Sequence, residues 1–183
     1  MIKKFLFSTL LVLCSFSAIF AQTKAKQDTK LEDPDNLASQ YFSQVMGVAI
    51  NATSNLKLYK FIYEWIGTPY SFGGNTKKGI DCSAFAKAIY EKVFNTTILR
   101  SSRDIFTMTD PLSKDELREG DLVFFKIKSR SISHVGVYLG DNRFAHSSSG
   151  GVKISNLNEP YYSRYFYKGG RILETAKKDF VEE

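Results

Sequence analysis

Apolar residues in the first half of the chain recur every three or four positions, which is the spacing of one face of an α-helix. The pattern predicts a helix over residues 55–66, capped by Ser54 or Asn55 and ended by Gly67 and Pro69. Its apolar face consists of Leu58, Phe61, Ile62 and Trp65. We interpret this face as core packing.

Two other segments carry the helical spacing. A short helix is expected within residues 36–52, on an apolar stripe of Leu37, Tyr41, Val45 and Val48. A longer one is expected to begin near Cys82, with Asp81 or Ser83 at its start and a buried stripe of Phe85, Ala88, Ile89 and Val93. Further along, Asp110 and Pro111 predict a turn, and residues 113–116 match a capping box for one helical turn.

After Gly120 the pattern changes to short apolar runs bounded by turn residues, which is typical of β-strands. Strands are expected at 121–125, 133–139, 143–146, 152–154 and 171–173. Residues 126–133 read as a polar loop. Because helices come first and antiparallel strands follow, the expected class is α+β, with N-terminal helices packed on a central antiparallel β-sheet.

The two ends of the chain differ from the rest in composition. Residues 1–21 combine two lysines, an apolar run and a final Ala21, the pattern of a secretory signal peptide. A permanent anchor is the alternative, but the apolar run is short for a membrane span. Lipidation at Cys14 is a second alternative, which the bulky residue before it disfavours. We therefore expect a protein exported to the periplasm or cell envelope.

The domain organisation follows from these patterns. We expect a linker and short helix over residues 22–54, a catalytic domain over 55–173 and a charged tail over 174–183. The 183 residues are 43% hydrophobic and 24% charged, an ordinary globular composition. Removing residues 1–21 takes away two lysines and no acidic residue, so the formal net charge falls from +6 to +4. That charge suits a polyanionic surface such as cell wall, and no nucleic-acid-binding module is recognisable.

Removal of the signal segment would also leave Cys82 as a single cysteine in an oxidising compartment. Such a residue pairs with another molecule, lies buried and inert, or acts as a nucleophile. A zinc site is a poor alternative, because the chain has only two histidines and the spacings are long. At the start of a helix, Cys82 would feel the positive end of the helix dipole, which lowers the pKa of a thiol.

The two histidines lie on either side of an expected β-hairpin turn. If residues 140–142 form a three-residue loop with Asn142 in the left-handed conformation, Leu139 faces Arg143. In that register His134 and His146 share one face of the sheet as diagonal neighbours. His134 is then the candidate base for Cys82, and His146 holds its other ring nitrogen. A two-residue loop would place the two imidazoles on opposite faces.

Several motifs resemble the NlpC-type bacterial cell-wall cysteine endopeptidases. They are Gly67-Thr68-Pro69-Tyr70 with Gly73-Gly74, Gly79-Ile80-Asp81-Cys82-Ser83, Glu119-Gly120-Asp121-Leu122-Val123-Phe124-Phe125, His134-Val135-Gly136-Val137-Tyr138-Leu139-Gly140, and His146 with Gly151-Val152. The resemblance covers roughly residues 55–173 and keeps the order and spacing of the motifs. Several motifs in order are far more specific than any one alone.

The resemblance implies a papain-like fold, with Cys82 as nucleophile, His134 as general base and His146 as the residue that orients it. It places Tyr70 beside the nucleophile and Asp81 and Ser83 along the substrate cleft. We add Arg100 to these candidate substrate-binding residues. The implied reaction is hydrolysis of peptidoglycan stem peptides, commonly between D-glutamate and a diamino acid, without a metal or organic cofactor.

Three positions depart from the family pattern, namely Ala84, Leu99 and Ile105. Ala84 stands where the family usually has glycine, and Leu99 and Ile105 lie in a segment that resembles a cleft wall. They put substrate preference in question more than catalysis. Other functions on the same scaffold are a wall amidase, an acyltransferase and a secreted toxin, and a non-catalytic wall-binding protein is the alternative of a different class.

Overall fold

The computed structural model describes residues 36–172. The predicted signal peptide, residues 22–35 of the linker, and the charged tail lie outside the described residues. The helices are α1 (Leu37–Met46), α2 (Leu56–Trp65), α3 (Cys82–Val93), α4 (Ser102–Thr107), the 3₁₀ turn η1 (Lys114–Glu116) and α5 (Pro160–Tyr165). Within this range the structure has no helix that is both long and apolar enough to span a membrane.

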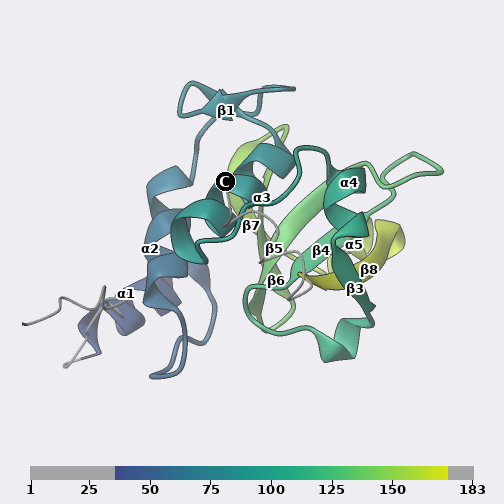
Figure 1. Cartoon of the computed structure of the whole chain (residues 1–183). Coiled ribbons are helices and arrows are strands. Elements are labelled where there is room, and N and C mark those ends of the chain that lie inside the picture. The colour runs from purple at the N-terminus through teal and green to yellow at the C-terminus, as the bar shows by residue number, and fades with distance from the viewer. Residues whose placement is uncertain (1–35, 173–183) are drawn as a thin grey trace, which may run out of the picture.

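Two short strands precede α3 and six form the main sheet. The strands are β1 (Asn75–Thr76), β2 (Gly79–Ile80), β3 (Thr109–Leu112), β4 (Leu122–Phe125), β5 (His134–Gly140), β6 (Arg143–Ser148), β7 (Gly151–Asn156) and β8 (Phe166–Ile172). The main sheet has the order β3-β8-β4-β5-β6-β7, and every neighbouring pair is antiparallel. Helices followed by an antiparallel sheet confirm the predicted α+β class (Figure 1).

The sheet is covered on both faces. Helix α3 packs on one face, with α2 against α3 and α1 against α2 (Figure 1). The larger core on this side includes Leu58, Ile62, Phe85 and Ile89. A smaller core on the other face joins Val123, Phe125, Tyr138, Phe144, Leu157 and Tyr162, the last from α5. This explains why β4 reads as a continuous apolar run, because all four of its residues are buried.

The predicted helix over 55–66 is confirmed as α2. The Asn55 side chain accepts a hydrogen bond from the backbone N–H of Leu58 and so caps it. The capping box at Ser113 and Glu116 is also confirmed. The sequence pattern did not reveal the short helices α4 and α5, and β8 begins five residues earlier than the strand expected at 171–173.

The predicted short helix within residues 36–52 is confirmed as α1. It buries Phe42 and Met46, and Val48 beyond its end is also buried, whereas the stripe residues Leu37, Tyr41 and Val45 are exposed. Both Tyr41 and Phe42 pack against Tyr63 of α2, with ring centroids 5.5 and 5.8 Å from that of Tyr63, and the Tyr41 hydroxyl donates to the Tyr63 hydroxyl at 2.6 Å. One prediction about local structure is wrong. The predicted turn at residues 110–111 lies instead in β3, an edge strand that tolerates a proline without an N–H.

The hairpin prediction is wrong in its loop but right in its register. Gly140 pairs with Arg143, so the loop has two residues, Asp141 and Asn142, with φ of 48° and 59°. That loop alone would shift the strands by one residue. A bulge between Tyr138 and Gly140 supplies the compensating residue, and the next pair is Tyr138 with Phe144. The strand faces are therefore those that the three-residue loop predicted.

Candidate active site

The start of α3 fixes the position of Cys82. Asp81 caps the helix by accepting a hydrogen bond from the backbone N–H of Ala84 at 2.8 Å, which makes Cys82 the first helical residue. Cys82 is only 8% exposed, and the backbone amides of Val135, Ser83 and Cys82 itself act to lower the pKa of its thiol. Because Val135 follows His134 on β5, the sulfur lies against the strand that carries the candidate base.

The protonation state of Cys82 corrects the expectation drawn from the helix dipole. Burial raises the pKa of the thiol to about 11, and the nearby Asp81 carboxylate adds to that effect. The three backbone N–H groups act in the opposite direction but do not outweigh burial. The resting sulfur is therefore a protonated thiol, which has to give up its proton as it attacks.

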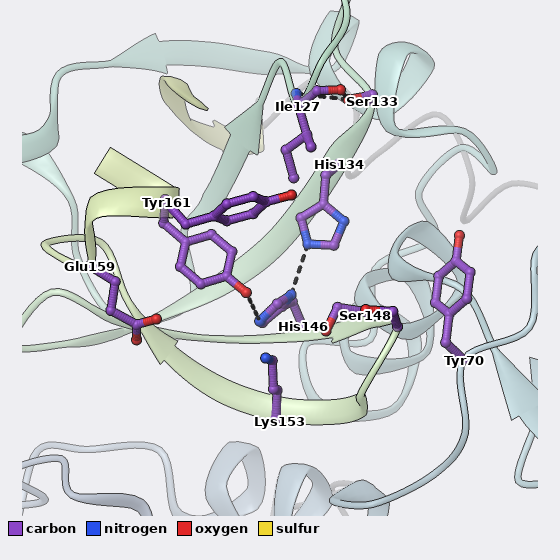
Figure 2. Close-up of a pocket in the computed structure, with 11 residues that line it drawn as sticks. Tyr70, Ile127, Ser133, His134, His146, Ser148, Lys153, Glu159 and Tyr161 are labelled. Atoms are coloured by element: carbon purple, nitrogen blue, oxygen red, sulfur yellow. Dashed lines mark hydrogen bonds between the residues drawn. The ribbon is translucent and has the colours of Figure 1, made fainter. Parts of the chain in front are cut away.

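The two histidines form the centre of a buried polar chain. His134 Nε2 lies 2.8 Å from His146 Nδ1, and both side chains are buried. On its far side, His146 Nε2 lies 3.1 Å from Ser155 Oγ and 3.3 Å from the Tyr162 hydroxyl oxygen. Figure 2 shows the His134–His146 contact, with the two rings close to perpendicular.

This series of hydrogen-bonded side chains restricts which ring nitrogens of the two histidines carry protons. For His134 Nδ1 to accept a proton, the neutral ring must carry its hydrogen on Nε2 and donate it to His146 Nδ1. His146 must then carry its own hydrogen on Nε2 and donate it to Ser155 or Tyr162. Ser155 and Tyr162 are thus in place to hold the tautomer that leaves His134 Nδ1 free as a base.

The charge state of the pair follows from burial. Burial lowers the pKa of His134 to about 4, and the positive charge of Lys153 contributes to the shift. Burial also holds the pKa of His146 well below its ordinary value, with His134 and Lys153 as further causes. Both imidazoles are therefore neutral at pH 7, as a general base requires.

We expect the stability of the fold to depend on pH through these histidines, which are the only two in the chain. The pKa of His134 is depressed from 6.5 to about 4 in the folded state, so the unfolded chain binds more protons between these values. The contribution of neutral His134 to the free energy of unfolding is fully present above pH 6.5 and is lost as the pH falls through 4. It amounts to about 3 kcal/mol for His134.

Urea unfolding between pH 7.5 and 4.5 measures this effect. The free energy of unfolding should fall more steeply in the wild type than in a His134→Gln, His146→Gln double variant, because carboxylates titrate alike in both. Parallel pH profiles for the two proteins would contradict the assignment.

The predicted substrate-binding residues fall into two groups. Tyr70 is 38% exposed. Partial burial raises the pKa of its hydroxyl, and the neighbouring Cys82 and Asp81 add to this effect. The hydroxyl therefore keeps its proton and remains a hydrogen-bond donor. Asp81, Ser83 and Arg100 instead bind one another. Arg100 donates to both Asp81 oxygens, at 2.9 and 2.7 Å, and to Ser83 Oγ at 2.9 Å.

The Asp81 carboxylate accepts more than this one pair. Besides Arg100 and the N–H of Ala84, it accepts hydrogen bonds from the Gly73 N–H at 3.0 Å and from the Ser83 hydroxyl at 3.1 Å. Burial works to raise its pKa, but the guanidinium and these donors outweigh burial and hold the pKa below its usual value. Asp81 thus joins the Gly-rich loop, the start of α3 and Arg100.

Two cavities meet at this site. One of about 510 Å³ is lined by Cys82, Asp81, Ser83 and Arg100, and the other, of about 550 Å³, by His134, His146, Lys153 and Tyr161. Tyr70 and Ser133 line both. Sequence reasoning missed Lys153, Ser155 and Tyr162. The alternation of β7 places Lys153 and Ser155 on one face, and the glycines at 150–151 between β6 and β7 are a hairpin signal that could have paired that face with His146.

The three departures from the family pattern line neither cavity. Ala84 and Ile105 are buried in the larger core, and Leu99 is partly exposed outside both cavities. The segment between Leu99 and Ile105 does line the 510 Å³ cavity, through residues 100–103, but Leu99 and Ile105 themselves do not. Among residues 36–172, no three histidine, cysteine, aspartate or glutamate side chains gather in a way that could hold a metal ion.

A family model described as NlpC/P60 matches residues 67–171, which is more than half of the chain and contains Cys82, His134 and His146. The chain belongs to the NlpC/P60 family. Membership agrees with the resemblance drawn from the motifs and with the papain-like arrangement of helices and sheet.

Curated relatives in the NlpC/P60 family share this segment. The chain is 46% identical over 111 residues to "Probable endopeptidase NlpC homolog" of Haemophilus influenzae, covering 60% of this chain and 58% of that protein. It is 42% identical over 114 residues to "Murein DD-endopeptidase MepS/Murein LD-carboxypeptidase" of Escherichia coli, covering 62% and 60%. The match thus spans less than two thirds of either relative.

Solved NlpC/P60 structures have the same fold. An NlpC/P60 family protein from Bacillus cereus is 33% identical, with a TM-score of 0.58 over 63% of this chain and 39% of that one. The NlpC/p60 domain of the peptidoglycan hydrolase SagA is 25% identical, with a TM-score of 0.55 over 63% of this chain and 96% of that one.

Proposed function

We propose that this protein is an exported cysteine endopeptidase that hydrolyses peptidoglycan stem peptides, with Cys82 as nucleophile. The observation that carries the proposal is the 2.8 Å contact between His134 Nε2 and His146 Nδ1. It leaves His134 Nδ1 free to act as the base, on strand β5 next to Val135, whose backbone amide acts to lower the pKa of Cys82. The names of the relatives support a wall peptide as substrate.

The chemistry begins from a neutral pair. His134 Nδ1 takes the thiol proton as the sulfur attacks the amide carbonyl carbon, and His146 stabilises the imidazolium by accepting from Nε2. The backbone N–H of Cys82 and the Tyr70 hydroxyl are the donors for the developing oxyanion. His134 then gives its proton to the leaving amine, and water hydrolyses the acyl-enzyme to regenerate the thiol.

The bond we propose is that between D-glutamate and the diamino acid. The name of the Escherichia coli relative favours a second candidate, the cross-link bond that a DD-endopeptidase cuts. The two candidates require the same nucleophile and base. They differ in which amine is released, so product masses separate them.

Digestion of purified sacculi followed by mass spectrometry of the soluble products tests the function. Cleavage after D-glutamate should release fragments that begin with the diamino acid, whereas cross-link cleavage should convert dimeric muropeptides into monomers. A binding domain without catalysis is the other outcome, and the raised pKa of the buried Cys82 thiol is the observation in its favour. Association with sacculi without any soluble product would establish that outcome and overturn the proposal.

The domain boundaries belong to the same proposal. Residues 1–21 act as the export signal, residues 22–54 form a linker and the short helix α1, and residues 55–173 form the catalytic domain. Edman sequencing of the exported protein should find Gln22 at its N-terminus, and retention of Met1 would contradict cleavage.

A further inference from the structure

Lys153 lies directly opposite the catalytic histidines. In the pairing of β6 with β7, Lys153 is the cross-strand partner of His146. Directly paired residues of an antiparallel sheet project from the same face, with Cβ atoms about 4.5–5.5 Å apart. Figure 2 shows the Lys153 side chain rising from β7 toward His146, with its ammonium end in the cavity.

The Lys153 ammonium has no counterion in the described part of the chain. The structure gives it no hydrogen bond or ion pair within residues 36–172, and its side chain is exposed in the 550 Å³ cavity. The acidic residue that lines the same cavity is Glu159, whose carboxylate accepts the backbone N–H of Asn156 at 2.7 Å. The cavity therefore presents a free cation to whatever occupies it.

The proposed chemistry identifies what occupies this cavity. His134 delivers its proton to the leaving amine, so the leaving-group side of the substrate must lie on the side of the imidazoles. His134, His146 and Lys153 line that cavity, whereas Cys82 and Arg100 line the other one. The group nearest Lys153 is thus part of the released amino acid and not of the acyl half.

We propose that Lys153 binds a free carboxylate on the leaving-group side of the substrate, an inference that rests on the proposed function. The chemical class is an amino acid residue with a second acidic group or a free C-terminus. A diamino dicarboxylic acid of the wall offers such a carboxylate on its side chain, and a terminal residue offers one at its α-carbon. A lysine-type diamino acid inside a longer stem peptide offers neither.

The position of Lys153 also connects binding to catalysis. Its positive charge opposes protonation of both imidazoles, which by itself weakens His134 as a base. A carboxylate bound to the ammonium cancels that charge at short range. His134 then becomes more basic when the carboxylated substrate is bound, so Lys153 should favour such substrates in turnover as well as in affinity.

The test compares Lys153→Gln with wild type on three γ-D-glutamyl–meso-diaminopimelate peptides: the free acid, its side-chain amide and its α-amide. Lys60→Gln is the matched control. Lys60 is exposed on α2, so this substitution removes one positive charge at a site away from the cavity. Binding is measured by calorimetry in a Cys82→Ala background, so that it needs no turnover, and kcat/KM is measured in the active proteins.

We expect Lys153→Gln to reduce the preference for the free acid over one of the amides by about ten- to a hundredfold, and Lys60→Gln to preserve it. The amide that abolishes the preference identifies which carboxylate Lys153 binds. An unchanged preference in Lys153→Gln, or equal losses on all three peptides, overturns the inference. Failure of wild type to cleave any peptide counts against the proposed function instead, because the binding arm still reports on Lys153.

Discussion

Replacing Cys82 by alanine is expected to reduce the release of soluble muropeptides from sacculi by at least about 10⁴-fold. Without the sulfur no acyl-enzyme forms, and His134 and His146 have no proton to accept. The loss should appear in kcat, because the cavities that bind the substrate remain intact. Release of products from purified sacculi, followed over time, measures it.

The control for this variant is its folding. Alanine is compatible with the first turn of α3, and the Asp81 cap on the N–H of Ala84 is retained. The thermal midpoint should therefore stay close to that of wild type, and the variant should still bind sacculi. Muropeptide release at the wild-type rate by folded Cys82→Ala protein would exclude Cys82 as the nucleophile.

Replacing Asp81 by asparagine is expected to destabilise the fold by about 3 kcal/mol. The carboxylate accepts from Arg100, Gly73, Ser83 and Ala84, and an amide nitrogen in place of one oxygen turns an acceptor into a donor facing those donors. We place the value at the lower end of the range for a broken buried pair, because 43% of the Arg100 side chain is exposed to water.

Denaturant unfolding at pH 7 checks this expectation. Asp110→Asn is a suitable control, because Asp110 is exposed on the edge strand β3 and its side chain has no hydrogen bond within residues 36–172. This substitution makes the same chemical change as Asp81→Asn. Equal stability of the Asp81 and Asp110 variants would contradict the structural role of Asp81. Activity should also fall in Asp81→Asn, because the same cap positions Cys82.

The Asp81 network changes how the predicted substrate-binding residues are understood. Sequence motifs placed Asp81, Ser83 and Arg100 along the cleft, and all three do line a cavity. Their side chains, however, also hydrogen-bond to one another. We therefore propose that they shape the cleft around Cys82, while Arg100 keeps part of its guanidinium exposed for substrate.

Local patterns were reliable where a single physical rule decided the outcome. Helix spacing and capping residues gave α2 and the start of α3 at Cys82, and alternation gave the strands that carry His134 and His146. The shared face of the histidines was also right, although the loop was not. The bulge before Gly140 restored the register that the pleat of the two strands requires.

A prediction failed where a local signal had two interpretations. A proline after an aspartate suggested a turn, but the edge of the sheet accommodates Pro111 as a strand residue. The strand that pairs with it, β8, lies much later in the chain, so a local pattern contains no information about it.

The sequence by itself determined the α+β class, the helix start that exposes the backbone N–H groups to Cys82, and the strand faces of His134 and His146. Only the tertiary structure decided the charge of these groups, because burial raises the pKa of the thiol and lowers those of the imidazoles. It also brought Ser155, Tyr162 and Lys153 to the site, since their contacts with His146 depend on how β7 and α5 pack beside β6. The pKa of each of these groups depends on how much water the whole fold excludes from it, and a local sequence pattern contains no information about that exclusion.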